Sequence, residues 1–149
     1  MTKFHRVVRL DHKPENLFEL VSDIHSYPNF IRWIQSMKVE PVSDNGDVVV
    51  RNGTAKVGFK GFSETMSTRV ESNSTDRTIR VSLIRGPLKK LDNAWTFKDA
   101  ERGCDVDFYV DFEFRNILLR ALAAANFEIA VNRIMAAFVA EADRRYKTA

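Results

Sequence analysis

Strict alternation between apolar and polar residues along 105–114 constrains the fold of this chain more than any other feature. The apolar residues occupy the even positions: Val106, Phe108, Val110, Phe112 and Phe114. The polar residues occupy the odd positions: Asp105, Asp107, Tyr109, Asp111 and Glu113. Successive side chains of a β-strand point to opposite faces of the sheet, so this period predicts a half-buried antiparallel strand. We interpret the acids as a solvated face paired with Lys and Arg of neighbouring strands, because the alternation alone explains them.

A second feature is the absence of Gly and Pro from residue 116 to about residue 146, where Ala, Leu, Arg and Glu dominate. This composition predicts a helix of about 46 Å, with Asn116 as its N-cap and a cationic last turn. We expect a broad apolar stripe of this helix to face the sheet. The stripe comprises Leu118, Leu119, Leu122, Ala123, Phe127, Ala130, Ile134, Ala137 and Phe138, flanked by Ile129 and Met135.

The remaining segments predict the other elements of the fold. Pro14 begins a helix that ends near Asp23, and residues 26–33 form a turn or a short helix. Strands are expected at 3–10, 37–42, 48–59, 62–70, 78–84 and 91–97, before the alternating strand. The order is one strand, two helices, six strands and a long helix. It predicts a single α+β domain, residues 1–149, in which a curved antiparallel sheet of about seven strands wraps around the C-terminal helix.

Composition excludes several classes of protein. The chain has 149 residues, of which 44% are hydrophobic, so we expect one globular domain rather than a disordered chain. Cys104 is the only cysteine, which excludes an internal disulfide and a Cys-based zinc site. No apolar run approaches the roughly 18 residues of a membrane span, and the N-terminus lacks a signal-peptide pattern, so a cytosolic location is expected. The net charge of +3 permits an anionic membrane surface or RNA as a partner but demands neither.

The sequence contains no recognisable catalytic or metal-binding motif. His5, His12 and His25 lack the spacing of metal ligands and are interpreted as surface or turn residues. The glycines fit no phosphate-binding fingerprint, and Cys104 is interpreted as a buried structural residue. We therefore predict no catalytic residue, no metal and no cofactor, and we do not expect an enzyme.

An apolar interior remains, and it is either a container for a ligand or an ordinary core. Ligand sites are concave and mostly apolar, with few polar groups. The candidate lining residues of an apolar tunnel are Trp33, Phe62, Met66, Leu83, Trp95, Phe108, Val110, Phe112, Phe127, Ile134 and Met135.

Four stretches of the chain, taken together and in order, are informative: Ser26–Trp33; Val57–Phe62 running on to Ser67–Val70; Gly86–Leu91 with Trp95–Phe97; and Cys104–Phe108 into Phe112–Phe114 and Leu118-Leu119. They resemble the helix-grip, START-like superfamily of lipid and polyketide-cyclase domains, and more closely its coenzyme Q-binding branch. The chain departs from the branch at Arg32, Ile34 and Leu88, where Pro, Cys and Phe are common. These departures bear on ligand specificity more than on fold.

The resemblance implies a sheet that grips the C-terminal helix and a tunnel for ubiquinone or a polyprenyl quinone intermediate, carried to respiratory or biosynthetic enzymes. A carrier of this kind is expected to be cytoplasmic and to touch the inner face of the membrane. We place its mouth and membrane contact at Phe30, Ile31, Arg32, Pro87, Leu88, Lys89 and Lys90. Arg32, Arg85 and both lysines would meet anionic headgroups, while Trp33 and Leu88 would enter the membrane.

Two other functions stay open at this point. A sister branch is described as a ribosome-association toxin that binds the large subunit and blocks subunit joining. The mild basicity fits that description, but +3 is small for an RNA-binding protein. An aromatase or cyclase would need a general acid or base in the cavity. The polar residues that could lie on the apolar faces are Asn93, Asn126 and Asn132, so this function ranks last.

Overall fold

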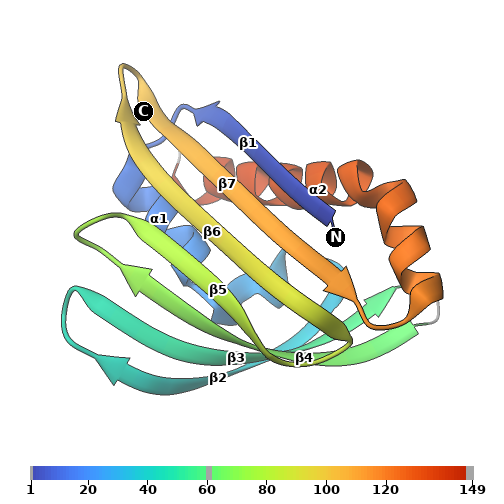
Figure 1. The fold of residues 1–149 in the computed structure, drawn as a ribbon. Coiled ribbons are helices and arrows are strands. Elements are labelled where there is room, and N and C mark those ends of the chain that lie inside the picture. The colour runs from blue at the N-terminus through green and yellow to red at the C-terminus, as the bar shows by residue number, and fades with distance from the viewer. Residues whose placement is uncertain (1, 60–61, 147–149) are drawn as a thin grey trace.

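The protein folds into one antiparallel sheet that curls around helices on a single face (Figure 1). The computed structural model describes residues 2–59 and 62–146, apart from the side chains of residues 2, 59, 62 and 123. The strands are β1 (Thr2–Leu10), β2 (Ile34–Asp44), β3 (Val48–Phe59), β4 (Phe62–Asn73), β5 (Thr78–Arg85), β6 (Leu88–Ala100) and β7 (Gly103–Phe114). The helices are α1 (Pro14–Ser22), the 3-10 helix η1 (Ile24–Asn29) and α2 (Ile117–Arg145). The predicted order of elements and the predicted fold class are confirmed.

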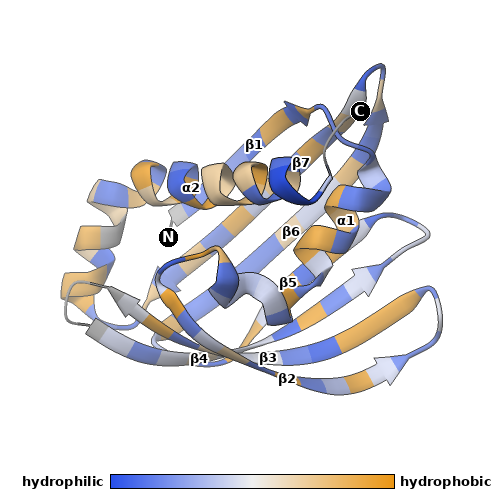
Figure 2. Ribbon diagram, turned by 180° about the vertical axis from the view of Figure 1, so that it is seen from behind, coloured by the Kyte–Doolittle hydropathy of each residue, from blue (hydrophilic) through white to orange (hydrophobic). Residues whose placement is uncertain are grey.

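The strands lie in the order β1-β7-β6-β5-β4-β3-β2. All neighbours are antiparallel, so hairpins join the strands from β2 to β7, and β1 pairs with β7 at the far edge. Figures 1 and 2 show α1, η1 and α2 gathered on the concave side. The apolar side chains of that side and those of the helices form the core.

The alternation along β7 fixes which of its residues face the helices. Phe108 pairs with Trp95 of β6, and both are buried, at 5% exposure each. On the convex side, Asp105 accepts a hydrogen bond from Arg9 at 2.8 Å, and Asp107 lies 2.7 Å from the His5 imidazole. The predicted division into an apolar face and a paired acidic face is confirmed.

Asp111 departs from that pattern, because it is only 2% exposed. In the sheet, Asp111 pairs with Lys3 of β1 on one side and with Asp92 of β6 on the other, so strands flank it on both sides. Lys90 donates to its Oδ2 at 2.6 Å. The prediction of a fully solvated acidic face is therefore wrong at this position.

Among the side chains that the structure describes, the long helix α2 has buried residues only in its second half. Asn116 caps it as predicted, accepting hydrogen bonds from Leu118 N at 2.8 Å and Leu119 N at 3.2 Å. In the second half the buried residues are Val131, Met135, Phe138, Glu141 and Ala142. Between residues 117 and 130 no described side chain is buried. Figure 1 shows the reason: α2 bends, and its first half descends past the end of the sheet instead of lying across it.

This arrangement corrects the predicted apolar stripe of the C-terminal helix. Leu118 and Leu122 are 66% and 48% exposed, and Ala130 is also exposed, although all three were expected to face the sheet. Phe127, Ile134 and Phe138 pack against the core as expected. The stripe was derived for a straight helix, and the bend removes its first half from the sheet.

Polar contacts anchor the C-terminal end of α2. His12 lies in the connection between β1 and α1, in agreement with its interpretation as a turn residue, but it is not on the surface: it is 7% exposed, and its Nε2 lies 2.7 Å from Asp143 Oδ1. Glu141 accepts hydrogen bonds from Arg144 and Arg145, and this pairing lowers its pKa to about 2. The second half of α2 is thus fixed by packing and ion pairs, whereas the first half lacks buried contacts.

Candidate functional site

The concave interior divides into a filled end and a more open end. At the filled end, the ring of Trp95 lies 4.7 Å from that of Phe108, 5.4 Å from that of Phe138 and 6.2 Å from that of Phe97. We call these four residues the deep aromatic cluster. Aromatic rings at such distances attract one another beyond their burial and fill the space between sheet and helix. Trp95, Phe108 and Met135, predicted to line a tunnel, are thus placed in the buried core.

Asn93 is the one predicted polar residue that lies on the concave side among apolar neighbours. It pairs with Val110 on β7 and Val81 on β5. Its Nδ2 donates to Tyr109 O at 2.8 Å, and its Oδ1 accepts from Trp95 Nε1 at 3.0 Å. The Asn93 amide is therefore the hydrogen-bond partner of two groups within the fold, the Tyr109 carbonyl and the Trp95 indole N–H. Asn126 is exposed on α2, whereas Asn132, also exposed, accepts a hydrogen bond on its side-chain oxygen from Arg6 of β1.

The more open end lies beneath the first half of α2. Phe127 packs its ring 4.9 Å from that of Phe112 and 5.6 Å from that of Phe4, and we call these three residues the Phe127 cluster. All three side chains are only half-buried, unlike the deep aromatic cluster. Other predicted lining residues are half-buried as well: Met66, Leu83 and Ile134. Val110 is 8% exposed, and the side chain of Phe62 lies outside the described part of the chain.

A groove of about 500 Å³ opens at this end of the molecule. It runs between β4, the β5–β6 turn and the start of α2, and is lined by Glu64, Thr65, Arg85, Gly86, Pro87, Arg115, Asn116 and Leu119. Arg115 joins two of its walls, since its backbone N donates to Pro87 O at 3.0 Å and its Nε to Leu88 O at 3.1 Å. Gly86 adopts φ +150°, and a Cβ there would lie 3.0 Å from Met66 Cγ. The close approach of this turn to β4 therefore depends on glycine.

The predicted mouth residues are only partly brought to this groove. Pro87 lines it, and Arg32 and Lys89 are exposed. Ile31 and Leu88 are buried, at 3% and 6% exposure. The expectation that Leu88 enters a membrane is therefore wrong in this conformation, because its side chain points into the protein.

The other predicted mouth residues are also engaged within the fold. The Phe30 ring packs 5.9 Å from that of Tyr27 and 5.3 Å from that of Phe138. Trp33 is half-buried against the core. Lys90 is bound to Asp111, which raises the pKa of the lysine.

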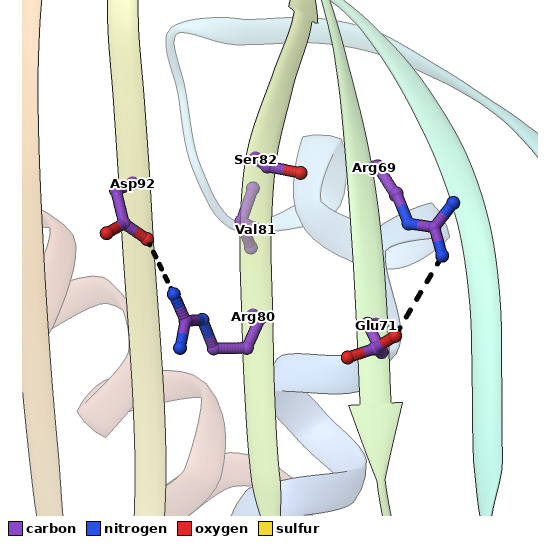
Figure 3. Close-up of a pocket in the computed structure, with 6 residues that line it drawn as sticks. All are labelled: Arg69, Glu71, Arg80, Val81, Ser82 and Asp92. Carbon is purple, nitrogen blue, oxygen red and sulfur yellow. Dashed lines mark hydrogen bonds and ion pairs between the residues drawn. The ribbon is translucent and has the colours of Figure 1, made fainter.

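A second, smaller hollow of about 220 Å³ lies on the convex side (Figure 3). Arg80 pairs with Asp92 at 3.1 Å, and Arg69 lies 3.9 Å from Glu71. Each charged group in the hollow thus has a partner of opposite sign, and all four are solvent-exposed or half-buried. Exposed pairs of this kind contribute little energy and leave no net charge for a ligand.

Residues with potential for metal binding or nucleophilic chemistry do not form a site in the described chain. Within residues 2–59 and 62–146, no three His, Cys, Asp or Glu side chains are grouped to hold a metal ion. Cys104 is fully buried, as predicted, and burial raises the pKa of its thiol to about 11. In the same residues, no helix is both long and apolar enough to cross a bilayer.

Sequence reasoning missed several residues that shape the groove. Glu64, Arg115 and Asn116 were not among the predicted lining residues, and Leu119 was assigned to the helix stripe. Gly86-Pro87 signalled a turn, and Arg85 and Arg115 flank the ends of the strands that meet there. The sequence therefore indicated the turn, but its position beside the start of α2 follows only from the folded sheet.

Comparison with known proteins places the fold in a family. Residues 10–139 match the family model described as polyketide cyclase/dehydrase and lipid transport. The ribosome association toxin RatA of Rickettsia prowazekii is 31% identical over 141 residues, covering 93% of this chain and 94% of that protein. The mitochondrial coenzyme Q-binding protein coq10 of Schizosaccharomyces pombe is 29% identical, covering 93% and 85%.

Solved structures show the same architecture. The 18 kDa protein CC1736 of Caulobacter crescentus superposes with a TM-score of 0.83 at 35% identity, covering 99% of this chain and 100% of that one. The ZhuI aromatase/cyclase from Streptomyces has a TM-score of 0.80 at 16% identity, covering 99% and 96%. Because its sequence identity is low, the similarity to the aromatase/cyclase concerns the fold alone.

Proposed function

Because the chain belongs to the polyketide cyclase/dehydrase and lipid transport family, in a branch with RatA and coenzyme Q-binding relatives, we propose that it binds and transfers a hydrophobic small molecule. The proposed ligand is ubiquinone or a polyprenyl quinone intermediate, carried without chemical change in support of respiration or ubiquinone biosynthesis. One observation carries the proposal. Beneath the first half of α2, the half-buried Phe127 cluster lies at the end of the sheet where the groove opens.

The energetics favour an apolar cargo at this end. Each methylene-sized group that moves from water to an apolar site contributes about 0.8 kcal/mol, so a polyprenyl tail needs an apolar path out of the bilayer. The Phe127 cluster with Met66, Leu83 and Ile134 would supply that path. The carbonyl groups of a quinone would remain near Arg85 and Arg115 at the groove, where hydrogen-bond donors are available.

The proposal involves no catalysis. An aromatase or cyclase needs an acid or base within reach of its substrate. The concave amide of Asn93 is instead occupied by Trp95 and Tyr109 O. We accordingly propose a cytoplasmic carrier that touches the inner face of the membrane.

Quinone uptake by purified, delipidated protein tests the proposal. The protein is incubated with vesicles that contain ubiquinone, separated from them, and assayed for quinone by ultraviolet absorbance. We expect uptake by the unaltered chain and at least a several-fold loss in Phe127→Trp, which adds bulk between sheet and helix. Phe18→Trp is the matched control, because Phe18 is also half-buried but packs edge-on against Phe97 under α1. No uptake, or equal uptake by both variants, would contradict this assignment.

A second candidate function is association with the ribosome. It is favoured by the likeness to the Rickettsia prowazekii toxin, which extends over 94% of that protein. Co-migration of the chain with the large ribosomal subunit in a sucrose gradient would support it. If the chain takes up no quinone but migrates with the large subunit, ribosome association would replace the carrier function.

A further inference from the structure

The outward side of the first half of α2 carries apolar side chains that the described part of the protein leaves about half or more exposed. Ile117, Leu118, Leu122 and Ile129 are 78%, 66%, 48% and 55% exposed. At about 100° per residue they fall, with exposed Ala121 and Ala125, within an arc of about 140° on one side of the helix. We call these six residues the outer stripe. It extends about 18 Å along the helix.

The outer stripe is unusual because it lies opposite the side of α2 that faces the protein. Phe127 and Leu119, on the inward side, are half-buried against the sheet and the groove. Figure 2 shows hydrophobic segments on this descending half of α2, beyond the end of the sheet. A contiguous exposed apolar surface generally marks a contact with a partner or a membrane.

Several cations lie near the N-terminal end of α2. Arg115 precedes the helix and Arg120 lies in its first turns, while Arg85 ends β5 and Lys89 lies at the start of β6, on either side of the Gly86-Pro87 turn that lines the groove. Arg120 donates to Phe114 O at 3.1 Å and pairs with Glu113 at 3.4 Å. Nearby acids are fewer: Glu64 in the groove, Glu113, and exposed Glu128, which falls within the arc of the stripe at its far end.

The sign of these charges is opposite to what the helix itself prefers. The macrodipole makes acids favourable and cations unfavourable near a helix N-terminus. The first turn of α2 contains no acid, and Arg115 directly precedes the N-cap. These cations do not stabilise the helix, but they would attract an external anion.

We propose, resting on the carrier function proposed above, that the outer stripe is an interfacial surface that docks this protein on an anionic phospholipid bilayer. The leucines and isoleucines would enter the boundary between headgroups and acyl chains, and the arginines and Lys89 would meet lipid phosphates. An RNA surface would match the cations but leave the stripe in water. A second copy would cover the stripe but bring the same positive charge against it. Docking would also place the groove, which lies beside the inward side of the same helix turns, at the membrane surface.

Co-sedimentation with quinone-free vesicles tests docking separately from cargo binding. One set of vesicles is phosphatidylcholine with phosphatidylglycerol, and the other is phosphatidylcholine alone. We expect sedimentation with the anionic vesicles, weakened by added salt, and at least about a tenfold loss of binding in the double variant Leu118→Asp, Leu122→Asp. Val42→Asp, at a residue 50% exposed on β2, is the control and should bind as the unaltered chain does.

The replaced leucines make no buried contact, so circular dichroism should show both variants folded. Equal sedimentation of the double variant and the unaltered chain would overturn the proposal, as would no sedimentation with anionic vesicles. A concentration-dependent dimer that the double variant abolishes would assign the stripe to a second copy instead. Lys89→Glu should reduce binding to anionic vesicles, and unchanged binding would contradict the role of the cations.

Discussion

Replacing Asn93 by Leu should destabilise the fold, because the amide is the partner of two interior groups. It donates to Tyr109 O at 2.8 Å and accepts from the indole N–H of Trp95, a residue that is 5% exposed. A leucine fills a similar volume and satisfies neither group. Each orphaned interior group costs about 1–3 kcal/mol, and burial of the leucine offsets about 1–2 kcal/mol. The net expectation for Asn93→Leu is a loss of about 2–3 kcal/mol in the free energy of unfolding.

Urea denaturation followed by tryptophan fluorescence measures this loss. With a typical slope of about 1–3 kcal/mol per M, the midpoint should fall by roughly 1 M. Asn126→Leu is the matched control, because Asn126 is exposed and donates only to Leu122 O of its own helix. We expect its free energy of unfolding to stay within about 0.5 kcal/mol of the unaltered chain. A similarly small change for Asn93→Leu would refute the structural role of this amide and return it to consideration as a ligand contact.

Three further predictions follow from single residues. Glu141→Gln should lower the free energy of unfolding by about 2–3 kcal/mol at pH 7, because pairing depresses the pKa of this carboxyl from 4.5 to about 2. The stabilisation is complete above pH 4.5 and is lost as the pH falls through about 2, so urea midpoints of variant and unaltered chain should converge on acidification; a constant difference would contradict the ion pairs. Cys104 should not react with a thiol reagent at pH 8 until urea unfolds the chain, since it is fully buried and its thiol has a pKa of about 11; rapid labelling of the native protein would disprove this. Gly86→Ala should lower the free energy of unfolding by about 1–3 kcal/mol, because φ is +150° and the new Cβ would press on Met66; an unchanged thermal midpoint would show that the turn tolerates a side chain.

Much of the fold could be predicted because local patterns and tertiary packing agree. The period of two along β7 identified its buried face, and the N-cap Asn116 marked the start of α2. The strands predicted at 37–42 and 48–59, and at 78–84 and 91–97, correspond to the separate strands β2, β3, β5 and β6. Each of these features is encoded within a few residues.

The errors arose where distant segments decide the outcome. The bend of α2 exposes Leu118 and Leu122, and helical periodicity does not reveal a bend. His12 is buried in the connection after β1, where Asp143 of α2, far away in the sequence, pairs with it. Leu88 is buried although it begins a strand after a turn, because it pairs with Phe114 of β7.

The candidate site shows the same limit. The sequence identified the apolar residues of the interior, including Phe112 and Phe127, but not their division into a filled end and a half-buried end. That division depends on Phe138, whose ring packs against Trp95 at one end, and on the bend that withdraws α2 at the other. The tunnel role of these residues stays a prediction that ligand measurements must decide.

The most direct test of the proposed function is the content of the protein as cells produce it. The chain is purified from cells that make ubiquinone, extracted with organic solvent, and the extract is examined by mass spectrometry and ultraviolet absorbance. We predict a stoichiometric polyprenyl quinone in the extract of the unaltered chain and a depleted one in Phe127→Trp. An extract without quinone or polyprenyl lipid, from protein that also takes up none from vesicles, would contradict the carrier function and identify the interior as ordinary core.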